Sequence, residues 1–496
     1  MAKDKEFKYG SVSIPRGEAK YSVIRWGFGG LNRTNTIDSG QLTDCQGVVV
    51  EPPYIYPTLI PHNFKNYTDA ISVFGFGDRI FVIYRSSSKI KIDCIDKNNN
   101  VYTGTMGNAK NTSEDFTPRM MVQFNVASNT ENIVSATYVR KLLIFPDLYS
   151  IDFDINANFT PLSLGNTYPK IKYATVYGSR VFGVDDNLVY ASSYNDYADW
   201  DLDTADEYSE ANAWVSMSQS NVKADGSFSA IATYDNHVVL FKKDFMQLVY
   251  NNKNPFRIVD VGGYGCDNPY AVTECGGILY FASSDAVYAF TGGTPKKISD
   301  ALDINSFRGA VLGSWRDKVY MCVSNTVYVY KDGVWSCSGV VDGGIKQFAS
   351  CKYGIAALYI GGTISFVDWS DDKTDDITAN WVLQYGNIDG GSWWFETDFM
   401  AVNKLDVRRI KKISILCDVN EGSHIDAYLL KNDEEFNAEK SQLVGTTNKY
   451  GRVIMRVLMN KTAAYMHRLR IVGNGKVKIL ALELQLSWGG DLYDEG

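Results

Sequence analysis

The chain has 496 residues, 45% of them hydrophobic and 21% charged, and its formal net charge is −8. This balance is typical of a folded globular protein, and the length predicts roughly two to four domains. Because the sequence has no run rich in Lys and Arg, the negative charge argues against tight, sequence-specific binding to nucleic-acid phosphates.

The N-terminal segment, residues 1–60, is predicted to be an extended arm with opening strands. Trp26–Asn32 is glycine-rich, and Gln41–Val48 follows it without helical periodicity. The residues after Met1 lack the apolar core of a signal peptide, and no run of about 18 apolar residues occurs. We therefore expect folding in the cytoplasm and no membrane segment.

The cysteines form no CxxC pair, and most lie in apolar strand contexts. This pattern favours buried free thiols that act as small hydrophobic side chains over disulfides. The eight cysteines are Cys45, Cys94, Cys266, Cys275, Cys322, Cys337, Cys351 and Cys417.

Residues 61–387 repeat one plan, in which short alternating runs are separated by tight turns. In one repeat Ala310–Trp315, Lys318–Val323 and Thr326–Tyr330 follow one another, separated by Arg316-Asp317 and Ser324-Asn325. Repeats of about 40 residues with three or four strands each indicate the blades of a β-propeller. The first turns of the repeats are placed near Gly77-Asp78, Arg140-Lys141, Gly178-Ser179, Asp235-Asn236, Gly276-Gly277, Arg316-Asp317 and Tyr353-Gly354.

The spacing predicts about six or seven irregular blades. Two intervals are longer, which predicts rim loops near residues 100–132 and 194–227. The WD40, kelch and sialidase blade signatures are missing from the sequence. The propeller prediction therefore rests on period and strand rhythm.

Residues 388–496 change to longer strands with short loops, as in a β-sandwich. Ile410–Leu416, Arg452–Val457 and Val477–Leu484 are examples. Asn432–Glu435 and Gly473–Gly475 are predicted hairpin turns. The fold prediction is therefore all-β: a propeller followed by a C-terminal β-sandwich.

A search of the sequence for catalytic chemistry assigns no catalytic, cofactor-binding or metal-binding residue. None of the four histidines has a partner at ligand spacing, and neither a nucleophile elbow nor a Walker loop occurs. We therefore predict a non-enzymatic protein without a cofactor. The histidines are His62, His237, His424 and His467.

Two acidic clusters are interpreted as solvated loops, with a calcium site or a catalytic carboxylate pair as the alternatives. Trp200, Trp369 and Trp393 are interpreted as packing residues, with stacking on sugar rings as the alternative. The clusters comprise Asp196, Asp199, Asp201, Asp203, Asp206 and Glu207, and then Asp368, Asp371, Asp372, Asp375 and Asp376.

Three passages resemble structural proteins of tailed phages. The first is Phe28–Asn32 followed by Gly40–Val48; the second runs from Tyr177 to Ser192 and closes with Asp196–Trp200. The third is Cys266–Tyr270 with Ser284–Gly292 and Ile298-Ser299. Together they are similar to the DNA-stabilisation, tail-hub and nozzle group of β-propeller proteins.

The resemblance implies a homo-oligomeric ring, commonly a hexamer in that group, below the portal and adaptor rings of the virion. Its partners would be further copies of the chain, the portal or adaptor, other tail proteins and packaged DNA that passes non-specifically through the channel. The main alternative is a carbohydrate-binding, receptor-binding propeller, and a glycosidase-type propeller is less favoured. Sugar binding predicts Trp or Tyr with Asp or Asn repeated at one end of each blade, whereas catalysis predicts converging carboxylates.

Overall fold

The computed structural model of the chain describes residues 21–34, 40–59, 61–108, 120–127, 138–165, 168–202, 210–216, 226–235, 237–251, 253–369, 391–397, 408–431, 434–458, 463–464 and 467–488. Within these ranges the regular structure is β-strand, apart from a 3₁₀ turn at Asp300–Leu302. No helix among the described residues is long and apolar enough to cross a membrane.

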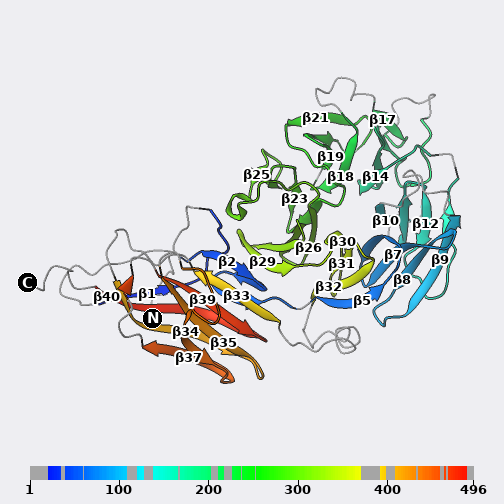
Figure 1. Cartoon of the computed structure of the whole chain (residues 1–496). Coiled ribbons are helices and arrows are strands. Elements are labelled where there is room, and N and C mark those ends of the chain that lie inside the picture. The colour runs from blue at the N-terminus through cyan, green and yellow to red at the C-terminus, as the bar shows by residue number, and fades with distance from the viewer. Residues whose placement is uncertain are drawn as a thin grey trace, which may run out of the picture.

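Seven four-stranded antiparallel sheets form the blades of a β-propeller (Figure 1). Blade one is β6 (Ala70–Phe76), β7 (Arg79–Ser86), β8 (Lys89–Ile95) and β9 (Val101–Asn108). Blade two is β10 (Met120–Ala127), β11 (Tyr138–Phe145), β12 (Tyr149–Asp152) and β13 (Leu162–Ser163). Blade three is β14 (Tyr173–Tyr177), β15 (Arg180–Val184), β16 (Val189–Ala191) and β17 (Trp214–Ser216). Blade four is β18 (Phe228–Tyr234), β19 (His237–Lys242), β20 (Phe245–Tyr250) and β21 (Arg257–Gly262).

Blades five to seven complete the ring. Blade five is β22 (Val272–Cys275), β23 (Ile278–Ala282), β24 (Val287–Phe290) and β25 (Lys296–Lys297). Blade six is β26 (Val311–Trp315), β27 (Lys318–Val323), β28 (Thr326–Lys331) and β29 (Val334–Val340). Blade seven joins β30 (Ile345–Cys351), β31 (Gly354–Tyr359) and β32 (Thr363–Trp369) to β5 (His62–Asn66), which comes from before blade one. The pairing of β5 with β32 closes the ring with backbone hydrogen bonds.

The turns predicted near Gly77, Gly178, Gly276, Arg316 and Tyr353 lie between the first two strands of their blades. Of the predicted pair Asp235-Asn236, Asp235 follows β18, and Asn236 lies outside the described residues. Arg140-Lys141 was expected to be a turn, but both residues lie inside β11, opposite Asn125 and Phe124. That prediction was wrong because β11 continues well beyond its pairing with β12, so the hairpin of blade two is longer than those of the other blades. The rim loop expected near residues 100–132 is likewise taken up in part by β9 and β10; residues 109–119 and 128–132 lie outside the described residues.

Adjacent blades bury their apolar faces against each other, as the propeller interpretation requires. Blades one and two share a core that includes Phe81 and Ile144, and blades three and four share one that includes Phe182 and Leu240. Backbones come close at the inner strands: a Cβ on Gly75 of β6 would lie 2.1 Å from the carbonyl oxygen of Ser350 on β30. Only a residue without a side chain fits at that crossing.

A β-sandwich adjoins the ring at blade six (Figure 1). One sheet has the order β3 (Val48–Glu51), β4 (Tyr54–Pro57), β40 (Val477–Trp488), β34 (Arg408–Val419) and β37 (Gly451–Leu458). Two further strands, β1 (Tyr21–Trp26) and β38 (Ala463–Ala464), pair with β40 and β34. The other sheet has the order β2 (Leu42–Gln46), β33 (Ser392–Thr397), β39 (His467–Asn474), β35 (His424–Lys431) and β36 (Gln442–Thr447).

The sandwich is built from both ends of the chain. Strands β1 to β4, which the sequence placed in a separate N-terminal segment, belong to the same two sheets as the strands after residue 388. The N-terminal strands are therefore an integral part of the sandwich. Local pattern did not indicate this, because the pairing partners are hundreds of residues away.

Candidate functional site

Polar contacts join the sandwich to blade six along their junction. Strand β3 lies along β29, the outermost strand of the blade, and main-chain groups of the two domains bond across the seam. Hydrogen bonds between residues that are far apart in the sequence therefore hold the two domains in one orientation. The contacts are Leu31 N to Trp335 O (2.7 Å), Val50 N to Ser336 Oγ (2.8 Å), Thr58 Oγ1 to Ser338 O (3.3 Å) and Cys337 N to Cys45 Sγ (3.4 Å).

A chain of five alternating charges crosses the same seam. Glu51 of β3 contacts Lys331 (3.1 Å) and Lys318 (3.5 Å) of blade six. Lys331 also pairs with Asp317 (3.0 Å), and Lys318 pairs with Asp368 of blade seven (3.1 Å). Each lysine therefore lies between two carboxylates, and the charge chain runs from Glu51 of the sandwich through Lys318 of blade six to Asp368 of blade seven.

The electrostatics of this charge chain favour its ionised form. Burial alone would lower the pKa of Lys331, but Asp317 and Glu51 raise it above its ordinary value. The pKa of Tyr320 is strongly raised, mainly by burial. The charge of Asp368 and the hydrogen bond that Tyr320 donates to it raise this pKa further. Tyr320 is therefore a permanent hydrogen-bond donor here, not an acid that titrates near neutrality.

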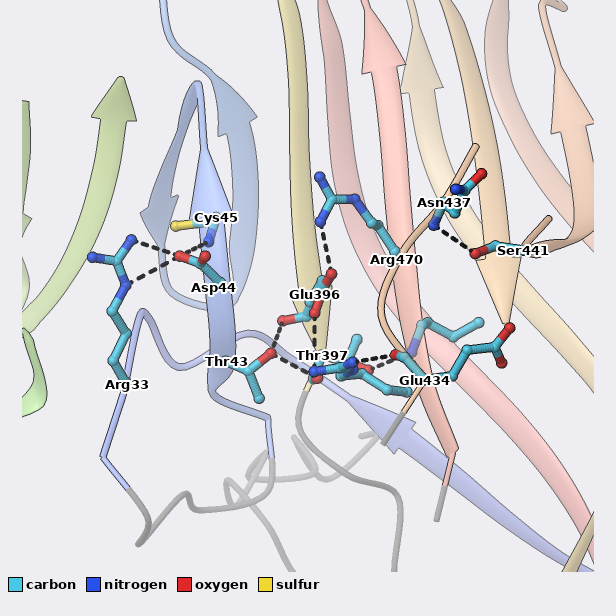
Figure 2. Close-up of polar contacts among 12 residues, drawn as sticks. Arg33, Thr43, Asp44, Cys45, Glu396, Thr397, Glu434, Asn437, Ser441 and Arg470 are labelled. Carbon is cyan, nitrogen blue, oxygen red and sulfur yellow. Dashed lines mark hydrogen bonds and ion pairs between the residues drawn. The ribbon is translucent and has the colours of Figure 1, made fainter. Parts of the chain in front are cut away.

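A second ion pair flanks the seam, on the N-terminal segment (Figure 2). Arg33 bonds Asp44 through both Nε (3.1 Å) and Nη2 (2.6 Å), and Nη1 donates to the hydroxyl of Tyr328 on blade six (3.0 Å). Asp44 also accepts the main-chain N–H of Cys45 (2.9 Å). Burial lowers the pKa of Arg33, but Asp44 outweighs that effect and raises it.

The outer face of the five-stranded sheet carries a buried carboxylate held by two arginines (Figure 2). Glu396 of β33 pairs with Arg470 (2.7 Å) and Arg468 (3.3 Å) of β39. The guanidinium of Arg470 also stacks on Trp394 at 3.7 Å and on Phe436 at 4.3 Å from the ring centroids. The two arginines neutralise the charge of Glu396, and Arg470 also packs against aromatic rings. The cluster therefore stabilises the pairing of β33 with β39.

The acidic cluster of blade three supplies turn contacts in its described part. Asp196 accepts the N–H of Ala198 (2.8 Å), and Asp199 accepts that of Asp201 (3.0 Å). In the second cluster Asp368 belongs to the charge chain described above. Asp203, Asp206, Glu207, Asp371, Asp372, Asp375 and Asp376 lie outside the described residues. Among the described residues no group of three His, Cys, Asp or Glu side chains could hold a metal ion.

Two of the three tryptophans singled out from the sequence are buried. Trp200 donates its ring N–H to Tyr197 O (2.9 Å), and Trp393, at 1% exposure, donates to Gly475 O (3.1 Å). Trp369 is half-buried at the end of β32. Trp200 and Trp393 are therefore packing residues, as the sequence interpretation expected, and neither offers a face to a sugar ring.

The histidines and cysteines also have structural surroundings where they are described. His237 lies edge-on to the ring of Tyr250 at 4.3 Å, and His424 lies 3.6 Å from Asp426. His62 begins β5 and His467 begins β39, in separate sheets. All eight cysteines are buried free thiols, which confirms the sequence prediction.

Sequence reasoning missed Glu51, Arg33 and the ion pairs of Glu396. Glu396 and Arg470 face each other only because β33 pairs with β39 in that register. An alternating Arg-Leu-Arg at 468–470 indicates an outward-facing pair, but no local signal identifies its partner.

Comparisons with known proteins identify no family for the chain. No protein-family model matches the sequence, and no curated protein matches it either. Among solved structures it is similar to the WD40 β-propeller domain of Doa1, with a TM-score of 0.39, 10% identity, and 64% of this chain and 98% of that chain covered. It is similar to the WD40 domain of Toxoplasma gondii coronin, with a TM-score of 0.39, 12% identity and coverages of 65% and 90%. An extracellular domain of a putative hybrid two-component system from B. thetaiotaomicron gives a TM-score of 0.40 and 9% identity, over 77% of this chain and 47% of that chain.

Proposed function

We propose that the chain is a structural protein of a tailed-phage virion, a tail-hub, nozzle or head-completion component that forms part of an oligomeric ring around the path of DNA. The three sequence passages that resemble this group support the proposal. In this role the chain catalyses no reaction, and its function lies in its shape and its interfaces.

The observation that carries the proposal is the junction between the propeller and the sandwich. Main-chain bonds along β29 and the charge chain centred on Glu51 fix the two domains in one orientation. The network is partly buried, and only Asp317 at its end is largely exposed. Removing Glu51 would leave Lys318 and Lys331 each with one carboxylate in place of two. Fixed relative orientation is what a building block of a ring needs, since an error in angle would accumulate from copy to copy.

The DNA path in this proposal runs between copies, outside the propeller axis. Inner strands of adjacent blades are linked directly, as in Thr175 to Thr233 (2.7 Å) and Thr273 to Ser314 (2.9 Å). The formal net charge of −8 gives the chain little attraction for phosphates. A ring wall that repels DNA weakly lets a duplex slide without being held.

The decisive experiment is a search for the chain in purified particles. Virions from the organism that encodes the chain would be banded on a density gradient, and their proteins identified by mass spectrometry. We expect peptides from both domains to co-purify with DNA-filled particles, and antibody label to lie at the portal vertex or tail. Peptides confined to the soluble fraction of the lysate would refute the proposal.

Carbohydrate binding is the alternative, and it is less well supported. The burial of Trp200 and Trp393 removes two of its three candidate stacking residues. A glycan array with the full chain tests it directly, and specific binding to one glycan class, together with absence from particles, would favour it.

A further inference from the structure

The described structure has two poles that differ in charge. Blade six carries the sandwich, and in a ring of seven the blades farthest from it are two and three, because blades seven and one lie between on one side and five and four on the other. In each sandwich sheet one edge strand lies at the propeller: β3 in the first sheet and β2 in the second. The strands at the opposite edges are β37 and β36. The edge formed by β36 and β37 is therefore the pole opposite blades two and three (Figure 1).

The pole at blades two and three is formed by the β10–β11 hairpin of blade two and the loop that follows β16 in blade three, on the same face of the propeller. The long β10–β11 hairpin of blade two packs against the loop that follows β16 in blade three, with Phe124 edge-on to Tyr197 at 5.7 Å. We call Tyr194–Leu202, with Tyr138 and Val139 of the hairpin, the acidic platform. Arg180 anchors this loop from below through the main-chain oxygens of Ser192 and Asn212.

The acidic platform combines negative charge with exposed apolar side chains. Residues 194–202 contain three aspartates and no Lys or Arg. Tyr138 is 64% exposed, Tyr194 52% and Leu202 49%. The nearby cation Arg140 is already paired with Asp154 at 2.8 Å. Exposed apolar groups rimmed by charge are typical of protein interaction surfaces.

The other pole has the complementary composition. We call residues 442–458, which comprise β36, β37 and their connection, the basic edge. They contain Lys449, Arg452 and Arg456 and no Asp or Glu. Tyr450 is 76% exposed, Leu443 52% and Ile454 49%. Arg452 pairs with Asp418 at 2.8 Å, whereas Lys449 and Arg456 are exposed and have no ion pair among the described residues.

We propose that the basic edge of one copy docks on the acidic platform of the next, so that the chain associates head to tail. This inference rests on the proposed function, which requires a ring, and names the two surfaces that close it. Opposite charge selects the partner surface and speeds encounter, and the apolar side chains of both poles supply area to bury. Two different surfaces that meet in this way form a ring when the rotation between copies closes.

The test uses the full chain and two single charge reversals, Asp201→Lys on the acidic platform and Arg456→Glu on the basic edge. Mass in solution is measured by light scattering over a wide concentration range, for each variant alone and for their mixture. Asp244→Lys is the matched control, because Asp244 is exposed in the turn between β19 and β20 on the opposite face of the propeller. Circular dichroism and thermal melting verify that every variant folds.

We expect the wild type and Asp244→Lys to form a defined multiple of the chain. Each pole variant alone should associate at least about tenfold more weakly, because like charges then face each other. Mixing the two variants should restore assembly. At one interface an intact Asp201 meets an intact Arg456, and at the next the two reversed charges, which are again opposite in sign, face each other.

Several results would overturn the inference. Folded variants that assemble as well as the wild type would show that a different interface is used, while the ring itself would stand. Loss of assembly in only one variant would point to a symmetric contact between like poles. A mixture that stays dissociated, or a wild type that is monomeric throughout, would also overturn it. The proposed function is judged separately, by the presence of the chain in particles.

Discussion

Replacing Arg180 by Met should destabilise the propeller substantially, because Arg180 is a fully buried cation that holds the loop of blade three. Its residue exposure is 0%. Nη1 donates to Ser192 O (2.6 Å) and Asn212 O (2.7 Å), and Nη2 donates to Glu210 O. The rings of Tyr194 and Phe256 lie 5.9 and 5.5 Å from its guanidinium carbon.

The magnitude follows from the carbonyl groups that lose their donors. Ser192 is buried and Asn212 half-buried, whereas Glu210 is exposed, so its carbonyl regains a hydrogen bond from water. Leaving a buried acceptor unsatisfied costs about 1–3 kcal/mol, so the carbonyl of Ser192 accounts for a loss in that range and the half-buried carbonyl of Asn212 for a smaller one. Met retains part of the packing and avoids burying a charge, so we expect a loss of about 3 kcal/mol in the free energy of unfolding.

The assay is urea denaturation of the wild type and of Arg180→Met, with hydrogen exchange of the amides in residues 192–202 and 210–213. Arg180→Lys is the matched control: it keeps the charge but lacks the planar fork that reaches three carbonyls, so its loss should be about half as large. The loop amides should exchange faster in Arg180→Met than in the wild type. A variant within about 0.5 kcal/mol of the wild type, the range of ordinary surface substitutions, would refute this reasoning.

Three further predictions concern the junction, the inner ring and the thiols. Glu51→Gln should weaken docking of the sandwich on the propeller by about 1–2 kcal/mol, because Lys318 and Lys331 each lose one of two carboxylates. Scanning calorimetry should then show separate melting of the two domains, and an unchanged single transition would contradict this prediction. Gly75→Ala should destabilise by about 1–3 kcal/mol in urea denaturation, since the new Cβ meets Ser350 O, whereas Gly293→Ala, where a Cβ meets nothing within 4 Å, should be nearly neutral. Burial raises the pKa of four thiols from 9.0 to about 11, so their neutral form is favoured in the folded chain. The resulting stabilisation is complete below pH 9 and is lost as pH rises towards 11. The urea midpoint should therefore fall across that range, and replacement of the four cysteines by Ala should make this fall smaller. These thiols are Cys94, Cys337, Cys351 and Cys417.

Agreement between sequence and structure is best where the signal is local. The alternation of Lys318–Val323 and Thr326–Tyr330 about Ser324-Asn325 predicts a hairpin, and the structure pairs Val323 with Thr326. Both turn residues have positive φ, 49° and 64°, which short polar side chains tolerate best. Period-two patterns and turn chemistry depend only on neighbouring residues, so one sequence suffices to locate them.

The turn predicted at Arg140-Lys141 in blade two was wrong because the local pattern there is ambiguous. Nothing in the composition of residues 138–141 distinguishes a turn from a strand that continues past its neighbour. Arg140 and Lys141 are polar because they project from the blade and pair with Asp154 and Asp152. Polar residues at the end of an apolar run therefore have two interpretations, and only the pairing partner separates them.

The sequence by itself determined the all-β class, the blade repeat and the buried state of the cysteines, because hydrophobic period, turn residues and thiol surroundings are local properties. Only the tertiary structure decided that β5 completes blade seven, that β1 to β4 belong to the sandwich, and that Glu51 meets Lys318 and Lys331. These contacts join residues far apart in the chain. Their register is set by how whole sheets pack, and no short stretch of sequence records it.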